Sequence, residues 1–442
     1  MPFIADHLLS EDNSGNTASI TFSAPAANDT IYPYKNAALP VAARVKDLLS
    51  RMTPEEKFWQ LFMIPGSVDT SNESKYKNGI FGFQFSAESS DGNTSQQILK
   101  YNTSESAVSL LKKINNTQKY FVEKTRLGIP IIAFDEALHG IVREGGTAFP
   151  QSIAFAATFD TAMVARVANA IALEAQARGI RQILSPVVNI ASDVRWGRVE
   201  ETYGEDPYLS SEIGVAFVKA FETKNIITTP KHFLANTGDG GRDSYPIHYN
   251  ERYLEEIHLP PFKALFQRGG ARSVMTSYNS IDGAPASAND WLLNQKLKKE
   301  WGFKGFVISD AGAVGGANVL HLTTKDYPAS GASSVINGLD VIFQTSVDHA
   351  TLFNPHFLDG TVDQKFIDSA VARVLTAKFE LGLFENPYMS ESKAQQILDN
   401  ANHKLIAKQA ALESIVLLKN QNNILPLSDK LRSIALIGTD AT

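Results

Sequence analysis

Cysteine is absent from the 442 residues of this sequence. A disulfide framework, a thiolate nucleophile and a cysteine-ligated zinc site are therefore excluded for this chain. Basic charge is also scarce, because 41 lysines and arginines are outnumbered by 47 aspartates and glutamates, and the net charge of −6 gives no basic surface for nucleic acid. Apolar runs are short, and residues 183–190 fall well below the roughly 20 residues that a membrane helix needs. We expect neither a nucleic-acid partner nor a membrane span.

The nine histidines form no H-E-x-x-H motif and no pair at metal-binding spacing, so the sequence requires no metal ion or other cofactor. Residues 1–28 lack the basic start and continuous apolar stretch of a signal peptide. Their serine, asparagine, threonine and alanine content is similar to that of a mature secreted protein after signal removal. We therefore expect residues 1–36 to form a polar tail and the protein to be periplasmic or secreted.

From about residue 37, short apolar runs alternate with helical patterns such as residues 40–52, 161–178 and 250–268. This alternation predicts parallel strands joined by helical crossovers. Seven or eight such units over residues 37–386 predict a (β/α)8 TIM-like barrel, with an open doubly wound sheet as the alternative. Seven runs have the length and composition of buried strands: residues 79–85, 129–135, 183–190, 226–232, 272–279, 306–310 and 339–343.

Beyond the barrel, residues 387–430 have the pattern of a helical linker, with one long helix predicted through Ile406, Ala410, Ser414, Leu417 and Leu418. Residues 431–442 contain an apolar run that ends in glycine, which is typical of the first strand of another α/β domain. No G-x-G-x-x-G motif follows that run, so nucleotide binding is not favoured. The sequence thus predicts a truncated second α/β domain after the linker.

Asp310 closes the apolar run at residues 306–310 and is followed by Ala311 and Gly312. A carboxylate at the C-terminal end of a barrel strand lies on the face that carries active sites, so Asp310 is a candidate nucleophile. An isolated Ser-Asp pair would more often cap the next helix. The catalytic interpretation is favoured because three other predicted strands also end in polar residues: Asp135, Lys231 with His232, and the Ser277-Tyr278-Asn279 run.

The loop at residues 192–207 follows a predicted strand and is rich in arginine, tryptophan and carboxylates. Guanidinium groups bind hydroxyls in fixed geometry, so we expect Arg195 or Arg198 to contact a substrate while the other supports the loop. The alternative is a purely structural network of ion pairs. Lys231 would favour ionised carboxylates nearby, and His232 is either a second donor or a satisfied core residue.

These segments resemble glycoside hydrolase family 3, which comprises β-glucosidases, β-xylosidases and glucan glucohydrolases. The resemblance covers residues from about 40 to the end. It implies a retaining, exo-acting β-glycosidase that releases a terminal sugar, with glucose as the expected sugar, from a β-linked oligosaccharide or glucoside. By the same resemblance Asp310 is the nucleophile, and the sugar is held by Asp135, Arg195 or Arg198, Lys231, His232, Met275 and Tyr278. Tyr278 would also position Asp310.

Two features depart from the family pattern. Ala311 stands where the family commonly has tryptophan, so an aromatic wall must come from elsewhere. The general acid/base is expected to be a glutamate in the missing second domain, which is possibly a separate chain. The alternatives are a single-domain β-N-acetylhexosaminidase-like hydrolase and a glycan-binding barrel without catalysis. The former uses a histidine in an Asp-Ser/Thr-His pattern, whereas this chain has Asp243-Ser244-Tyr245 with His248 three positions later.

Overall fold

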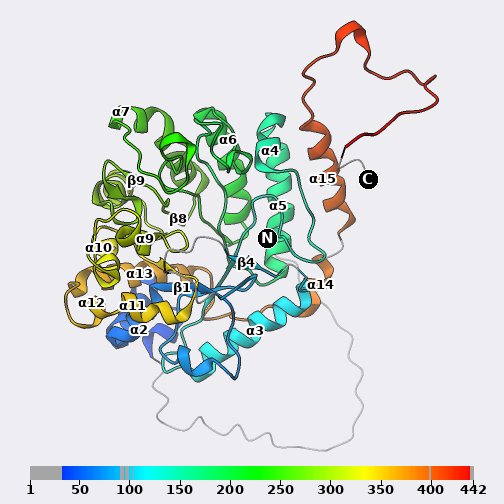
Figure 1. Ribbon diagram of the computed structural model, residues 1–442. Coiled ribbons are helices and arrows are strands. Elements are labelled where there is room, and N and C mark those ends of the chain that lie inside the picture. The colour runs from blue at the N-terminus through cyan, green and yellow to red at the C-terminus, as the bar shows by residue number, and fades with distance from the viewer. Residues whose placement is uncertain (1–31, 90–93, 95–98, 103, 398–399, 439–442) are drawn as a thin grey trace, which may run out of the picture.

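The computed structural model describes residues 32–89, 94, 99–102, 104–397 and 400–438 (Figure 1). Six parallel strands form one sheet in the order β12-β1-β2-β5-β6-β7, and β11 pairs in parallel with β8. These eight parallel strands are β1 (Phe62–Pro65), β2 (Gly82–Gln84), β5 (Ile132–Asp135), β6 (Gln182–Ile183), β7 (Ile227–Thr228), β8 (Ser273–Met275), β11 (Phe306–Ile308) and β12 (Ile342–Phe343).

Two isolated parallel bridges join these pieces into a ring. Phe233 pairs with Thr276, which links the ends of β7 and β8, and Ile308 pairs with Val341, which links β11 to the start of β12. All eight strands therefore run in the same direction around a TIM-like barrel, as the sequence predicts, and the open-sheet alternative is wrong. Their C-terminal ends meet at one face, which is where barrel enzymes place their active sites.

Helices surround the strands (Figure 1). The longer ones begin with side-chain caps, such as Asp160 before α5, Asp206 before α6 and Asp363 before α13, each of which accepts backbone N–H groups of the first turn. The main helices of the barrel are α1 (Val41–Arg51), α2 (Pro54–Gln60), α3 (Ala107–Lys124), α5 (Thr161–Ala177), α6 (Pro207–Glu222), α8 (Leu259–Ala264), α10 (Tyr327–Ile336) and α13 (Gln364–Glu380).

The interior of the barrel is filled by aromatic side chains. Phe81 precedes β2, and its ring centroid lies 6.4 Å from that of Phe134 on β5 and 5.6 Å from that of Phe306 on β11. All three residues are almost completely buried. Because rings from separate strands meet at the centre, the barrel is a packed core rather than a pore, and only its C-terminal rim is free to form a pocket.

The seven strand runs identified in the sequence all contain observed strands, and among the eight barrel strands only β1 was not predicted. β1 has four residues and starts two residues after α2 ends, so no turn signal separates the two elements. The helix predicted at residues 250–268 forms as one helical stretch from Glu251 to Gly269 that includes two π-helical segments. Packing starts slightly before residue 37, because Tyr34 is buried and donates to the carbonyl oxygen of Leu127.

Two short hairpins lie close to the C-terminal ends of the strands. One pairs β3 (Ala87–Glu88) with β4 (Lys100–Tyr101), and the other pairs β9 (Ser280–Ile281) with β10 (Ala284–Pro285). The first hairpin follows β2 and the second follows β8. In the part of the chain that the structure describes, no helix is long and apolar enough to cross a membrane.

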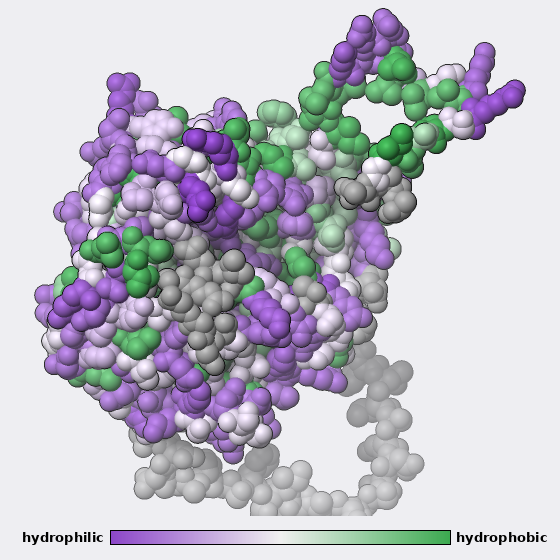
Figure 2. Space-filling view, in the orientation of Figure 1, coloured by the Kyte–Doolittle hydropathy of each residue, from purple (hydrophilic) through white to green (hydrophobic). Residues whose placement is uncertain are grey.

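The C-terminal helix α15 (Ala401–Glu413) packs against α5 and α4 (Ser152–Thr158), after the short helix α14 (Glu391–Ile397). It ends at Glu413, before Ser414, Leu417 and Leu418, so the predicted linker helix is shorter than expected. Residues 415–438 extend away from the barrel, and apolar side chains lie along this extension (Figures 1 and 2). Ile437 is 93% exposed there.

The strand predicted near Ile434 does not form in the described residues. A strand needs a neighbour to pair with its N–H and C=O groups, and the extension runs beside none. The second α/β domain thus stays a prediction, and the apolar sequence that prompted it is exposed.

A buried contact fastens α15 to the barrel. His403 Nδ1 lies 2.9 Å from Glu174 Oε1 on α5, and both side chains are nearly inaccessible to solvent. Glu174 Oε2 accepts in turn from the backbone N–H of Thr147. Replacement of His403 leaves a buried carboxylate oxygen without this partner.

We expect His403→Ala to destabilise the docking of α15 by about 1–3 kcal/mol, the usual cost of an unsatisfied buried polar group. Hydrogen exchange of residues 401–413 should accelerate, while exchange in the barrel strands stays unchanged. Lys408→Ala, at an exposed position of the same helix, is the matched control. Equal acceleration in both variants would contradict a specific role for His403.

Candidate active site

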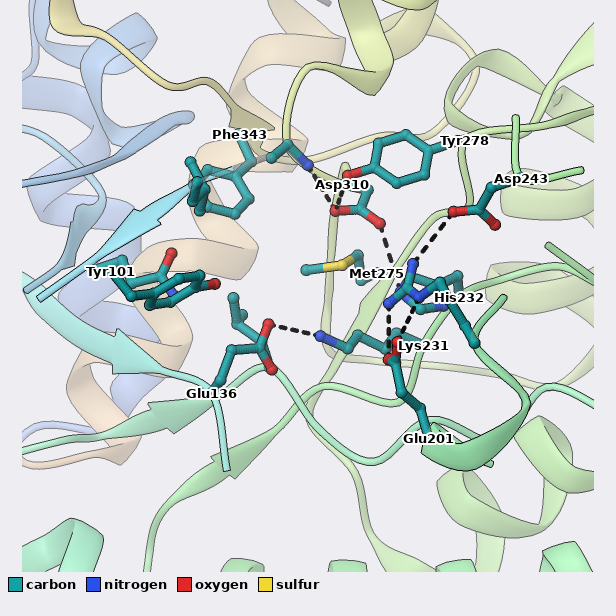
Figure 3. Close-up of a pocket in the computed structure, with 15 residues that line it drawn as sticks. Tyr101, Glu136, Glu201, Lys231, His232, Asp243, Met275, Tyr278, Asp310 and Phe343 are labelled. Atoms are coloured by element: carbon teal, nitrogen blue, oxygen red, sulfur yellow. Dashed lines mark hydrogen bonds and ion pairs between the residues drawn. The ribbon is translucent and has the colours of Figure 1, made fainter. Parts of the chain in front are cut away.

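A cavity of about 350 Å³ opens at the C-terminal ends of the barrel strands (Figure 3). Seven of the eight barrel strands place at least one residue in its wall, within three residues of the strand's last position. The cavity is lined by Gln84, Leu99, Tyr101, Glu136, Leu184, Arg198, Glu201, Lys231, His232, Asp243, Met275, Tyr278, Asp310, Ala311 and Phe343. Six of the eight candidate residues taken from the sequence are among them.

Asp310 lies two residues after β11 and is 7% exposed. Its Oδ1 accepts hydrogen bonds from the Tyr278 hydroxyl at 2.9 Å and from the backbone N–H of Ala311 at 2.7 Å. Its Oδ2 lies 3.5 Å from His232 Nε2. Burial raises the pKa of Asp310 above its usual value, and the positive charges of Arg198 and Lys231 oppose that rise. The carboxylate is thus held rigidly through one oxygen, with the other directed to the cavity side.

Arg198 organises the charged side of the cavity. It makes two parallel bonds to Glu201, at 2.7 and 2.9 Å, and its Nη2 donates to His232 Nε2 at 2.9 Å. Because a guanidinium only donates, His232 Nε2 is the acceptor and Nδ1 carries the proton that reaches Asn189 Oδ1. Burial, followed by the charges of Arg198 and Lys231, lowers the pKa of His232 well below its usual value. His232 is therefore neutral, and it positions Arg198 rather than donating to a ligand.

Lys231 and Glu136 form a second charged pair in the cavity. Lys231 Nζ donates to Glu136 Oε1 at 2.7 Å, and the lysine is 4% exposed. Burial raises the pKa of Glu136, against the opposing effect of Lys231. A sugar hydroxyl placed here would meet an ammonium donor and a carboxylate acceptor together.

Asp135 is turned away from this pair. Its Oδ2 accepts from Arg143 Nη2 at 2.9 Å, while its Oδ1 accepts from the Ser86 hydroxyl and from the backbone N–H of Glu136. Both oxygens are therefore engaged, and Asp135 does not line the cavity with Asp310. Of the two adjacent carboxylates at the end of β5, the structure places Glu136 in the cavity rather than Asp135, the residue chosen from the sequence.

Arg195 also lies outside the cavity. Its side chain is 68% exposed and bonds Asp193, so the arginine of this loop that lines the cavity is Arg198. Asp243 lies in the cavity wall, where its Oδ1 accepts from Trp196 Nε1 at 2.9 Å. His248, the residue weighed for a single-domain acid, is 68% exposed in its side chain and lies 3.6 Å from Asp282. It is not among the residues that line the cavity.

The aromatic wall expected from elsewhere comes from two elements. Phe343 ends β12, Tyr101 belongs to β4, and both line the cavity that also contains Ala311 (Figure 3). Met275, at the end of β8, covers part of the same wall. Gln84, at the end of β2, donates weakly to the Tyr101 hydroxyl at 3.4 Å.

Sequence reasoning missed Glu136, Gln84, Tyr101 and the supporting Asn189. The signal for Glu136 was available, because two consecutive carboxylates end one strand and side chains alternate in direction there. No comparable signal marks Tyr101, which depends on a two-residue strand in a loop. Among the residues that the structure describes, no group of three histidine, aspartate or glutamate side chains has an arrangement that could hold a metal ion.

Comparisons with known proteins agree with this geometry. Residues 55–377 match the family profile described as the glycosyl hydrolase family 3 N terminal domain. A β-xylosidase from Formosa agariphila is 34% identical over 362 residues, covering 76% of this chain and 50% of its own length. A periplasmic β-glucosidase from Salmonella typhimurium is 32% identical over 412 residues, covering 90% of this chain and 50% of its own.

A solved β-glucosidase from Erythrobacter marinus superposes with a TM-score of 0.80 at 32% identity, covering 90% of this chain and 53% of that one. The chain thus spans about half the length of the curated relatives that it matches.

Proposed function

Since this chain belongs to glycosyl hydrolase family 3, we propose that it is the catalytic barrel of a retaining, exo-acting β-glycoside hydrolase of the β-glucosidase type. The observation that carries the proposal is Asp310. It lies in an open, polar cavity at the C-terminal rim of a barrel, with one oxygen fixed by Tyr278 and a backbone N–H. A carboxylate that only capped the next helix would not need a tyrosine hydroxyl from another strand.

In the proposed reaction Asp310 Oδ2 attacks the anomeric carbon, because Oδ1 already accepts two hydrogen bonds. The bond between the anomeric carbon and the leaving oxygen breaks, and that oxygen takes a proton from the general acid. Water, deprotonated by the conjugate base, then attacks the anomeric carbon of the glycosyl ester and frees Asp310. Two inversions give net retention of configuration.

The groups opposite Asp310 are proposed to hold the terminal sugar. Glu136 replaces Asp135 in this role, since its carboxylate lies in the cavity beside Lys231. Arg198 faces the same space, His232 acts through Arg198, and Met275 and Tyr278 complete the wall. We propose terminal glucose as the substrate sugar. Xylose is the second candidate because a relative is named β-xylosidase.

The general acid/base is proposed to come from outside residues 1–442. Each other carboxylate that lines the cavity is bound to a cation or to fixed donors: Glu136 to Lys231, Glu201 to Arg198, and Asp243 to Trp196 and Asn236. In this proposal residues 37–386 are the catalytic domain, residues 387–430 are the linker, and residues 431–442 begin a second α/β domain.

Two alternatives receive less support. A β-N-acetylhexosaminidase-like acid at His248 is disfavoured because that side chain is exposed and paired with Asp282. A glycan-binding barrel without catalysis would not require the buried Asp310. A periplasmic or secreted location is also proposed, following the name of the Salmonella typhimurium relative, and cell fractionation tests it.

The decisive experiment is pre-steady-state release of dinitrophenol from dinitrophenyl β-glucoside, beside nitrophenyl β-glucoside. A burst near one equivalent with the activated substrate, then slow turnover and little reaction of the other, is the expected result for this chain alone. Efficient turnover of both substrates would place the acid within the 442 residues. Failure to release either phenol, with glucose still bound, would favour the glycan-binding alternative.

Glu136→Gln is expected to lower kcat/KM about 10- to 100-fold, mainly through KM, because hydrogen bonds to charged groups contribute about 1.5–3 kcal/mol. The loss should be equal for dinitrophenyl and nitrophenyl glucosides if Glu136 binds sugar. A loss confined to the poorer leaving group would instead identify Glu136 as the acid. Glu205→Gln, at an exposed position, is the matched control.

A further inference from the structure

A second cavity, of about 370 Å³, adjoins the first. It shares five wall residues with the catalytic cavity but not Asp310, Tyr278 or Met275. The shared residues are Tyr101, Glu136, Arg198, Glu201 and Lys231. The two cavities therefore adjoin at the charged pairs, and Asp310 lines the first alone.

This arrangement fixes which end of a bound sugar approaches the second cavity. A pyranose whose anomeric carbon faces Asp310 directs the opposite side of its ring away from Asp310. In Figure 3, Glu136, Lys231 and Glu201 lie across the pocket from Asp310. These residues border the second cavity, so a group attached at the far end of the sugar would pass between them into that cavity.

The residues that line only the second cavity present mainly apolar surface to it. Leu138 and Val142 contribute aliphatic surface, beside the ring of Tyr101. The remaining two residues, Asp135 and Arg143, bind each other at 2.9 Å, and Arg143 Nη1 also donates to the Val142 carbonyl oxygen. A second sugar, with several hydroxyls to satisfy, would find few free partners there, whereas an alkyl chain would find matching surface.

We infer that the second cavity binds an apolar acyl group, carried as an ester on the primary hydroxyl at C6 of the terminal hexose. The substrate class is thus a 6-O-acylated β-glucoside. The ester takes no part in the reaction, and hydrolysis at the anomeric carbon releases the acylated sugar intact. This inference rests on the proposed function and specifies the substrate of that same site.

The test compares dinitrophenyl β-glucoside with its 6-O-butanoyl ester, using the wild type and Val142→Trp. Val142 is 59% exposed, so a larger side chain can fill the cavity mouth without disturbing the core. The wild type should hydrolyse the ester with kcat/KM at least equal to that of the parent. Val142→Trp should lower kcat/KM for the ester roughly tenfold, the discrimination that an apolar pocket gives, and leave the parent within twofold.

Val194→Trp is the matched control, because Val194 is 82% exposed and lines neither cavity. Calorimetry with free glucose and 6-O-butanoyl-glucose gives a readout that needs no turnover, and the ester should bind more tightly to the wild type only. Hydrolysis of the parent with rejection of the ester would overturn the inference while leaving the proposed function intact.

A further comparison of methyl and octyl β-glucosides separates the two ends of the substrate. If Val142→Trp impairs the octyl glucoside rather than the ester, the cavity holds the leaving group, and the inference is wrong. Absence of hydrolysis and of glucose binding in the wild type would refute the proposed function and the inference together.

Discussion

Asp310→Gly is expected to abolish turnover of dinitrophenyl β-glucoside, with a fall in kcat/KM of at least about 10⁴-fold, the scale seen when one member of a catalytic unit is removed. The glycine removes the only oxygen that is placed to attack the anomeric carbon, while Tyr278 and the backbone N–H of residue 311 lose their acceptor. Asp310 is 7% exposed but is not part of the hydrophobic core, so the fold should persist in the variant. Near-ultraviolet circular dichroism checks that it does.

Azide separates loss of the nucleophile from general damage. In Asp310→Gly the anion can enter the vacated space and attack the anomeric carbon directly, which gives an α-glycosyl azide by one inversion. Partial recovery of dinitrophenol release, with that product, is the expected result. Asp282→Asn, at an exposed carboxylate, should behave as the wild type. Residual activity without azide at more than a hundredth of the wild-type level would remove Asp310 from the mechanism.

Much of the architecture was accessible from the sequence because barrel strands are short, apolar and separated by helices. All seven predicted strand runs contain strands, since a fully buried parallel strand leaves a continuous apolar signature. Ring closure was not accessible in the same way. It depends on pairings such as Phe233 with Thr276, which join residues far apart in the chain.

The sequence located the strand ends that form the candidate site, but it did not determine which of two neighbouring side chains faces the cavity. Lys231, His232, Tyr278 and Asp310 follow their strands and meet in one cavity. The choice between Asp135 and Glu136 needed the position of Arg143, eight residues further along, which captures Asp135. Sequence spacing carries no information about such a partner.

The same limit applies to the loop at residues 192–207. Arg195 and Arg198 are equivalent in chemistry, and only the structure shows that Arg195 pairs with Asp193 outside the cavity, whereas Arg198 contacts Glu201 and His232 in the cavity wall. The structure also decides the role of His232. The sequence left His232 as either a second donor or a satisfied core residue, and in the structure Arg198 occupies Nε2 and makes that nitrogen an acceptor.

Arg198→Met is expected to lower kcat/KM about 10- to 100-fold at neutral pH, because the charge-assisted bonds of Arg198 to the site contribute about 1.5–3 kcal/mol. The acid limb of the pH profile should also move. Arg198 lowers the pKa of Asp310 against the stronger effect of burial, so its removal raises that pKa further. Catalysis requires ionised Asp310, and therefore the fall in kcat/KM on acidification should begin at a higher pH than in the wild type.

Arg195→Met provides the matched control, since it removes the same side chain from an exposed position in the same loop. Its pH profile should superimpose on that of the wild type. Glu201 supplies a second check, because Arg198 lowers the pKa of this half-buried carboxylate, and loss of its bidentate partner lets Glu201 protonate more readily. The double variant Arg198→Met with Glu201→Gln should then regain part of the folding stability that Arg198→Met loses. Its acid limb should stay at the higher pH of the single variant. An acid limb that moves to lower pH in Arg198→Met would mean that Arg198 does not act on Asp310, and that another group controls the ionisation required for catalysis.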